Sequence, residues 1–313
     1  MAASKLTAEE FIAEFNALGA SKLAKKYGLN IRSVFDRRRH FEQLGHKMEG
    51  PHSQPNRPLP SYPHRADLQI QSGTVIVAGD AHYRPGESPL MHRAVVAFCK
   101  EFKPKAVINN GDSIDAPSIS KHAPIGWESR PKLADEIEAA KERLHEIEKA
   151  AFKAEKIWNL GNHDARFETR IATVAPEYAQ IHGVHLKDHF PVWRSAWSTW
   201  INNDVVVKHR FKGGIHAVHN NTLWSGKTMV TGHLHSAKIT PFSDYNGTRF
   251  GVDTGCIADV DAPTFTDYTE DNPKNWRSAF CVLTFKDGLL LQPELALKWN
   301  DDYVQFRGQI IRP

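Results

Sequence analysis

The chain has 313 residues, of which 24% are charged and 41% are hydrophobic, and these fractions are ordinary for a soluble globular protein. This length allows one sizeable domain with an appendage. Its three cysteines, Cys99, Cys256 and Cys281, are odd in number and scattered, which excludes a disulfide framework and a CxxC zinc site. No apolar run has membrane-spanning length, and "MAASKLTAEE" lacks the apolar core of a secretion signal. We therefore expect a cytoplasmic protein without a membrane partner.

The net charge of +4 is distributed unevenly along the chain. The first 65 residues contain eleven Lys and Arg against six Asp and Glu, whereas the remainder contains 29 against 30. The stretch "GPHSQPNRPLPSYPH" has five prolines in fifteen residues, a composition incompatible with a regular helix or a central strand. We predict a basic module at residues 1–48, a Pro-rich linker at 49–67 and a larger domain at 68–313.

The basic module is predicted to be helical. Thr7 and Glu10 have capping-box spacing, and Phe11, Phe15 and Leu18 then fall on one helical face. The next segment, "SKLAKKYGLNIRSVFDRRRHFEQLG", predicts a short helix, a break at Gly28 and a longer helix. The core positions expected in this segment are Ala24, Leu29, Val34, Phe41 and Leu44.

This segment resembles a helix-turn-helix module. It departs from that pattern at Arg37, where many members bury an apolar side chain. The resemblance implies that Arg32, Arg38 and Arg39 contact phosphates or base edges, as residues of a recognition helix do. DNA is therefore the expected partner, and a basic helix that docks another protein is the alternative.

The larger domain contains five apolar runs of strand length, each followed by polar residues. In chain order they are "TVIVAGDAH", "KAVINNGDSID", "KIWNLGNHD", "VVVKHR" and "KTMVTGHLH". Helical patterns at 91–103 and 131–153 separate the first three runs. This alternation predicts an α/β fold, in which ligands gather outside the carboxyl ends of the strands. The five polar endings should therefore converge.

In this order, the five motifs resemble those of the calcineurin-like metallophosphoesterase family over residues 74 to 235. The fourth motif reads "HR" where that family usually has His followed by Gly. The resemblance implies a four-layer αββα sandwich, with two mixed sheets flanked by helices and preceded by the small all-α module. A late hairpin is expected around Asp287 and Gly288.

The resemblance also implies two divalent metal ions. The ligands expected for the first ion are Asp80, His82 and His235, those for the second are Asn162, His209 and His233, and Asp112 bridges both. This donor set favours manganese, with iron, zinc or nickel as alternatives. In the fourth motif His209 is preferred because it directly follows the strand, and His216 and His219 compete with it.

The reaction expected from this site is phosphodiester hydrolysis by a hydroxide that bridges the two ions. His163 is expected to protonate the leaving oxygen, with Asp164 fixing its ring. Asp115 and Arg166 either contact substrate or remain solvated.

DNA is the expected substrate because of the basic module. The alternatives are a phosphomonoesterase or small-nucleotide phosphodiesterase with a recruitment module, and a DNA-binding regulator with a vestigial enzyme domain. The oligomeric state stays open. Trp193, Trp197 and Trp200 have helical spacing and predict an apolar stripe for the core or for self-association, with base stacking as the alternative.

Overall fold

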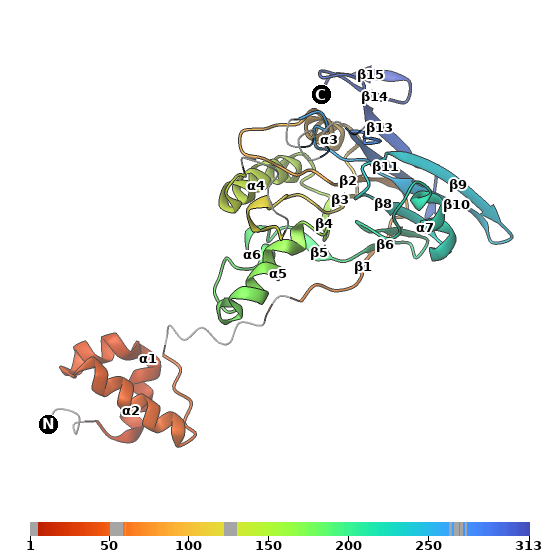
Figure 1. The fold of residues 1–313 in the computed structure, drawn as a ribbon. Helices are drawn as coiled ribbons and strands as arrows, with labels where there is room; N and C mark the ends of the chain where they lie inside the picture. Colours follow the sequence, from red (N-terminus) through yellow and green to blue (C-terminus); the bar gives the residue numbers. More distant parts are fainter. Residues whose placement is uncertain are drawn as a thin grey trace. The chain divides into compact units, whose positions relative to one another are not determined.

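The computed structural model describes residues 6–50, 59, 61–121, 130–262, 265, 269, 272 and 274–313. The chain forms two compact units, Met1–Leu59 and Pro60–Pro313. Figure 1 shows their helices and strands. Among the described helices, none combines the length and the apolar composition that crossing a bilayer requires.

The first unit consists of α1 (Ala8–Tyr27) and α2 (Ile31–Gln43). The predicted capping box is present, because the Thr7 amide donates to Glu10 Oε2 at 2.8 Å and the Glu10 amide donates to Thr7 Oγ1 at 3.2 Å. The backbone of Gly19 leaves helical geometry at a φ of 73°, so α1 is made of two helical segments. Gly28 then ends α1 in the left-handed conformation that glycine adopts without strain.

A small apolar core holds this unit together. Its buried members are Phe11, Phe15, Leu23, Ala24, Val34, Phe41 and Met48. The prediction that Leu44 joins this core is wrong, because Leu44 follows the last residue of α2 and is 61% exposed. Arg37 lies where an apolar residue is common: its guanidinium is 4.6 Å from the Phe11 ring centroid and donates to the Leu6 carbonyl at 2.7 Å.

The second unit contains two β-sheets. The smaller sheet has the order β1-β6-β7-β8-β10-β9, and the larger has the order β15-β14-β13-β11-β2-β3-β4-β5, with β12 paired to β11. The strands of the smaller sheet are β1 (Ala66–Leu68), β6 (Thr199–Ile201), β7 (Val205–Val207), β8 (Thr228–Thr231), β9 (Lys238–Asp244) and β10 (Gly247–Asp253). Those of the larger sheet are β2 (Gly73–Ala78), β3 (Ala106–Asn109), β4 (Glu155–Asn159), β5 (Arg194–Ala196), β11 (Ala279–Lys286), β12 (Leu289–Leu290), β13 (Glu294–Lys298), β14 (Val304–Phe306) and β15 (Gln309–Ile311).

All five predicted strands are present, as β2, β3, β4, β7 and β8. β2, β3 and β4 are parallel neighbours in the larger sheet, and β7 and β8 are parallel neighbours in the smaller one. The predicted hairpin is also confirmed, because β11 and β12 pair across Asp287 and Gly288, which both have positive φ.

Consecutive side chains of β2 point to opposite faces of the larger sheet, and each face is covered by another layer of the fold. Val75 and Val77 contribute to the core between the two sheets, whereas Ile76 and Ala78 face the core under the helices. On that outer side lie α3 (Leu90–Phe102) and α4 (Leu133–Ala150), and α7 (Ala217–Ser225) packs on β8, β9 and β10. The predicted αββα order is therefore confirmed (Figure 1). The remaining helical segments are η1 (Pro117–Ile119), α5 (Asp164–Val174), η2 (Pro176–Tyr178) and α6 (Leu186–His189).

The second unit begins upstream of residue 68, where the larger domain was expected to start. β1 starts at Ala66 and pairs in parallel with β6. Ser198 Oγ donates to the His64 carbonyl at 2.8 Å, and the Tyr62 hydroxyl donates to Glu168. These contacts fix the described residues from 61 onwards to the larger unit, so the proline-rich composition extends into ordered structure.

The tryptophan series does not form the apolar helical stripe that its spacing predicts. The segment forms β5 and β6, with Trp193 just before β5, Trp197 between the two strands and Trp200 on β6. Trp193 is buried, whereas Trp197 is 40% exposed. The three cysteines are free and buried.

Glu136 on α4 is a fully buried carboxylate. Its Oε1 accepts from the Ala116 amide at 3.1 Å, and its Oε2 has no hydrogen-bond partner among the described residues. Burial, reinforced by the negative charge of Asp115, raises the pKa of Glu136 to about 7 from 4.5. The folded protein then keeps a proton that the unfolded chain releases, so stability falls as pH rises through this interval.

We expect Glu136→Gln to remove this pH dependence while keeping an acceptor for Ala116. Between about pH 5 and about pH 8 its free energy of unfolding should rise relative to the wild type by on the order of 1 to 3 kcal/mol. Urea unfolding followed by circular dichroism at both pH values measures this difference. An equal difference at the two pH values would contradict the buried, uncompensated carboxylate.

Candidate metal centre

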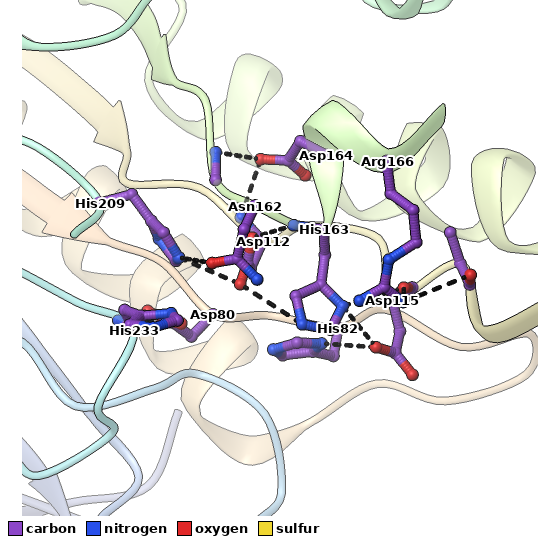
Figure 2. A network of polar contacts seen from close by, with 12 residues as sticks. Asp80, His82, Asp112, Asp115, Asn162, His163, Asp164, Arg166, His209 and His233 are labelled. Atoms are coloured by element: carbon purple, nitrogen blue, oxygen red, sulfur yellow. Dashed lines mark hydrogen bonds and ion pairs between the residues drawn. The ribbon is translucent and has the colours of Figure 1, made fainter. Parts of the chain in front are cut away.

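The polar residues that follow β2, β3, β4, β7 and β8 lie together at one edge of the two sheets (Figure 2). Histidine and aspartate ligand atoms gather there in three groups suited to a metal ion, each with its atoms within 4.8 Å of one another. His82, Asp115 and His163 form one of them, and the other two consist of predicted ligands. The first of these two is Asp80, His82 and His235, and the second is Asp112, His209 and His233. The described residues thus provide His and Asp clusters able to bind metal.

The first group is buried and only partly satisfied by protein contacts. His235 Nε2 lies 3.0 Å from Asp80 Oδ1, and Asp80 is fully buried. His82 Nδ1 lies 3.5 Å from Asp115 Oδ1, but His82 Nε2 is buried without a hydrogen-bond partner among the described residues. A buried polar atom left unpaired costs about 1 to 3 kcal/mol. A metal ion bound to His82 Nε2 would remove that cost, so the residues fit such an ion.

The second group is organised around His209. Its Nε2 lies 3.0 Å from Asp112 Oδ2 and 3.2 Å from Asn162 Oδ1. Its Nδ1 lies 2.8 Å from the Asn110 carbonyl, an acceptor that fixes the proton on Nδ1 and leaves Nε2 for a ligand role. The ring of His233 is 5.2 Å from that of His209.

The competing histidines of the fourth motif lie elsewhere. His216 directly precedes α7 and His219 lies on α7, and both are exposed. The His219 ring packs against Phe242. The structure therefore brings only His209 of these three to the other candidate ligands.

The negative charges of the aspartates and the positive charges of the protonated histidines in the two groups stabilise one another. Burial lowers the pKa of His209, but the negative charges of Asp112 and Asp80 outweigh it and raise that pKa to about 10. Burial raises the pKa of Asp112, but His209 and the other nearby histidines hold it well below its usual value. Divalent ions would take over the role of these protons, since ligand imidazoles bind metal in their neutral form.

Several candidate ligands have left-handed backbones. A non-glycine residue with positive φ costs on the order of 1 to 3 kcal/mol, and such residues concentrate at functional sites. The candidate ligands in this conformation are Asp80, His82, Asp112, His233 and His235, with φ of 54°, 42°, 52°, 71° and 55°. The loops after β2, β3 and β8 therefore adopt backbone conformations that these residues disfavour intrinsically, so tertiary contacts must stabilise them.

His163 lies between the two groups without belonging to the predicted ligands. Its Nδ1 lies 2.7 Å from Asp115 Oδ1 and 3.0 Å from the Asp115 carbonyl, while its Nε2 lies 3.9 Å from Asp112 Oδ2. Asp115 thus holds the ring, with Nε2 directed toward the centre (Figure 2). Arg166 Nη1 donates to the same carbonyl at 2.8 Å and is half-buried, so it is fixed at this loop.

The expectation that Asp164 fixes the His163 ring is not what the structure shows. The Asp164 carboxylate instead accepts from the amides of Asp112, Ser113 and Gly161 and from Trp158 Nε1, at 2.8, 2.9, 2.9 and 2.9 Å. Because a carboxylate and a ring on consecutive residues point in different directions at the start of α5, sequence adjacency did not imply contact. The spacing of Asp112 and Asp115 within one loop is the signal that could have identified the actual partner.

Two aromatic residues also border the first group and were missed from the sequence. The ring of Phe265 is 5.5 Å from that of His82, and the ring of Trp276 is 5.1 Å from that of His235. Both follow the last recognised motif by at least thirty residues, and no local pattern marks them.

Gly161 allows the loops after β3 and β4 to approach closely. A Cβ atom at this position would lie 2.0 Å from Asp112 Oδ1. We expect Gly161→Ala to displace Asp112 and to lower metal affinity by about 10- to 100-fold, as losses of ligand support do. Titration of the protein with metal against a competing chelator measures this effect. Gly213→Ala is the control, because no heavy atom lies within 4 Å of its added Cβ; equal affinities of the two variants would contradict the role of Gly161.

Comparison with known proteins gives distant structural similarity only. No family model and no curated protein sequence matches the chain. Zinc-bound Vps29 from Entamoeba histolytica aligns at 13% identity and a TM-score of 0.38, over 77% of this chain and 97% of its own. YfcE, a phosphoesterase from E. coli, aligns at 14% and 0.32, over 76% and 96%. Vps29 from Chaetomium thermophilum aligns at 9% and 0.36, over 74% and 89%.

Proposed function

We propose that this protein is a phosphodiesterase that uses two divalent metal ions and hydrolyses DNA. The observation that carries the proposal is the convergence of the polar residues after five strands, with His163 Nε2 directed toward the buried carboxylate of Asp112. Ion-binding groups next to a positioned proton donor suit the hydrolysis of a phosphoester.

The proposed ligands divide into two sets that share one carboxylate. Asp80, His82 and His235 would hold one ion, and Asn162, His209 and His233 the other, with Asp112 between them. Two divalent ions at these residues, with manganese favoured, would activate a water and stabilise the charge on the phosphate.

His163 supplies the proton in this proposal. Asp115 accepts from Nδ1 and keeps the ring oriented, so Nε2 is the atom that transfers a proton to the leaving oxygen. Arg166, held by the Asp115 carbonyl, stabilises the same loop. The proposal thus assigns proton transfer to His163 and orientation of its ring to Asp115.

α2 supports DNA as the substrate. Arg32, Arg38 and Arg39 lie on it, with Arg38 paired to Glu42 and Arg39 paired to Asp36 at 2.8 and 2.7 Å. Partly exposed pairs of this kind contribute about 0 to 1 kcal/mol, so DNA phosphates can displace the carboxylates. Binding of the module to DNA would raise the local concentration of phosphodiesters at the metal centre.

A second candidate is a phosphomonoesterase or small-nucleotide phosphodiesterase whose module recruits another protein. The observation that favours it is the exposure of two apolar side chains on α2, because Ile31 and Phe35 are each 42% exposed. The third alternative, a regulator with a vestigial enzyme domain, does not explain why a set of candidate ligands is brought together.

We expect the metal-loaded protein to hydrolyse bis(p-nitrophenyl) phosphate faster than p-nitrophenyl phosphate. His163→Ala should keep its metal content and lose about 10² to 10⁴ in kcat, the usual contribution of a positioned proton donor. Steady-state rates and elemental analysis of the same samples measure both quantities. A faster monoester reaction would favour the second candidate, and loss of metal in His163→Ala would make His163 a ligand.

Asp115→Asn and Asp164→Asn form a matched pair for the orientation of His163. Asp115→Asn should lower kcat with little change in KM, because the His163 ring loses the negative charge of the partner 2.7 Å from its Nδ1. Its effect on metal binding should be smaller than that of Asp164→Asn, because its contact with the proposed ligand His82 is longer, at 3.5 Å. Asp164→Asn should weaken metal binding, since it disturbs the amides that support Asp112. The reverse result would restore Asp164 as the orienting residue.

The salt dependence of DNA binding tests the module. Replacing Arg32, Arg38 and Arg39 by Ala should weaken binding of duplex DNA and flatten the log–log dependence of affinity on salt, by about 0.9 per lost phosphate contact. The triple Lys variant retains the charges and should retain most of the slope. Equal slopes for the Ala variant and the wild type would show that these residues do not contact phosphates.

A further inference from the structure

A cationic and aromatic surface lies directly beside the candidate metal centre. We call it the α7 patch and define it by Lys208, Arg210, Phe211, Lys212 and Trp224. The chain contains no Asp or Glu from residue 205 to residue 243, a stretch that includes five Lys and Arg. Among the described residues, no carboxylate forms an ion pair with Lys208, Arg210 or Lys212. The patch is therefore uniformly positive.

The aromatic rings of the patch are exposed and lie next to ammonium groups. Phe211 is 43% and Trp224 is 71% exposed. Lys212 Nζ lies 5.5 Å from the Phe211 ring centroid and 4.5 Å from that of Trp224, and Lys208 Nζ lies 5.4 Å from that of Phe211. Cations and flat apolar surfaces thus alternate over a short distance.

The loop that carries the patch is anchored at both ends. His209, a proposed metal ligand, lies between Lys208 and Arg210, and its carbonyl accepts from the Gly232 amide at 2.9 Å. The Lys212 amide donates at 2.9 Å to Oδ1 of Asn221, a buried residue of α7. Phe211 follows His209 by two residues, which places their Cα atoms within about 7 Å. A molecule bound to the patch therefore reaches the edge of the metal centre.

We propose that the α7 patch binds single-stranded DNA and leads its phosphodiester backbone to the metal centre. This inference rests on the proposed function. A single strand presents phosphates and unpaired base faces in alternation, and proteins bind it with cations and aromatic stacking platforms. The patch offers both in the same alternation.

Two other occupants fit the patch less well. Lysine is depleted from the centre of protein–protein interfaces, whereas here a lysine ammonium lies over each exposed ring. Ile215 and Leu223 nearby are 76% and 49% exposed and would suit an anionic bilayer, but the unpaired cations next to His209 match a phosphodiester substrate. The experiment must therefore distinguish binding to a bilayer from binding to single-stranded DNA.

The experiment measures the affinity of the full-length protein for a fluorescein-labelled oligothymidylate by anisotropy, with a chelator present to prevent cleavage. All samples carry the Ala replacements of Arg32, Arg38 and Arg39, so that binding reports on the second unit. We expect Phe211→Leu and Trp224→Leu each to weaken binding about tenfold, the range of one lost stacking contact. Lys212→Gln should weaken binding and reduce its dependence on salt. Affinity for a duplex of the same length should change less.

Phe152 and Lys153 provide the matched control. Phe152 is 73% exposed, and Lys153 Nζ lies 5.5 Å from its ring centroid, the same distance as between Lys212 and Phe211. This pair follows α4, which covers the opposite outer layer from α7 (Figure 1). Phe152→Leu and Lys153→Gln should leave oligothymidylate binding unchanged, and equal losses at both pairs would overturn the proposal in favour of unspecific attraction.

Two further measurements complete the test. Loss of binding to phosphatidylserine vesicles without loss of oligothymidylate binding, in the patch variants, would identify a membrane surface and overturn the proposal. Hydrolysis of bis(p-nitrophenyl) phosphate by the metal-loaded Phe152→Leu and Lys153→Gln variants should equal that of the parent. If the parent itself does not hydrolyse the diester, the proposed function fails, while the binding measurement still decides what the patch binds.

Discussion

The buried carboxylate of Asp164 is the interaction on which the candidate centre depends most. It accepts four hydrogen bonds, from the amides of Asp112, Ser113 and Gly161 and from Trp158 Nε1. Burial of an ionised carboxylate is costly unless such donors replace its hydration. These donors belong to β4 and to the loops after β3 and β4, so one side chain fixes both loops relative to each other. Asp164 is also the first residue of α5, where the helix dipole favours a negative charge.

The same constraint explains the strained backbone around the centre. Asp112 has a φ of 52° and is held by Asp164 through its own amide and by the His163 amide through its Oδ1. Asp80 is held in the same way, because its carboxylate accepts from the His233 amide at 3.1 Å. The carboxylates that are proposed to bind metal thus also organise the neighbouring loops. The apolar core between the two sheets supplies the stability that offsets this strain.

The sequence predicted the strands and their order because apolar runs and the turns after them are local features. It also predicted that the histidines after these strands lie together, as they do in the structure, since parallel strands end at the same edge of a sheet. The contacts within the centre, in contrast, join residues that are far apart in the sequence. Asp164 follows His163 directly, yet the ring is held by Asp115, some fifty residues earlier. The prediction that Leu44 is buried was wrong for a related reason. Its spacing continues the apolar face of the helix, but α2 ends one residue earlier.

The cationic groups of the two units differ in a way that composition could not reveal. On α2, Arg38 and Arg39 are paired with carboxylates of the same helix, so their net field is weak until a stronger anion displaces those partners. In the stretch from 205 to 243 no acidic residue is present, so Lys208 and Lys212 act without such competition. The near balance of charge over residues 66 to 313 therefore hides a positive region beside His209. Local charge around the centre, and not the net charge of the unit, determines how strongly an anion is attracted to it.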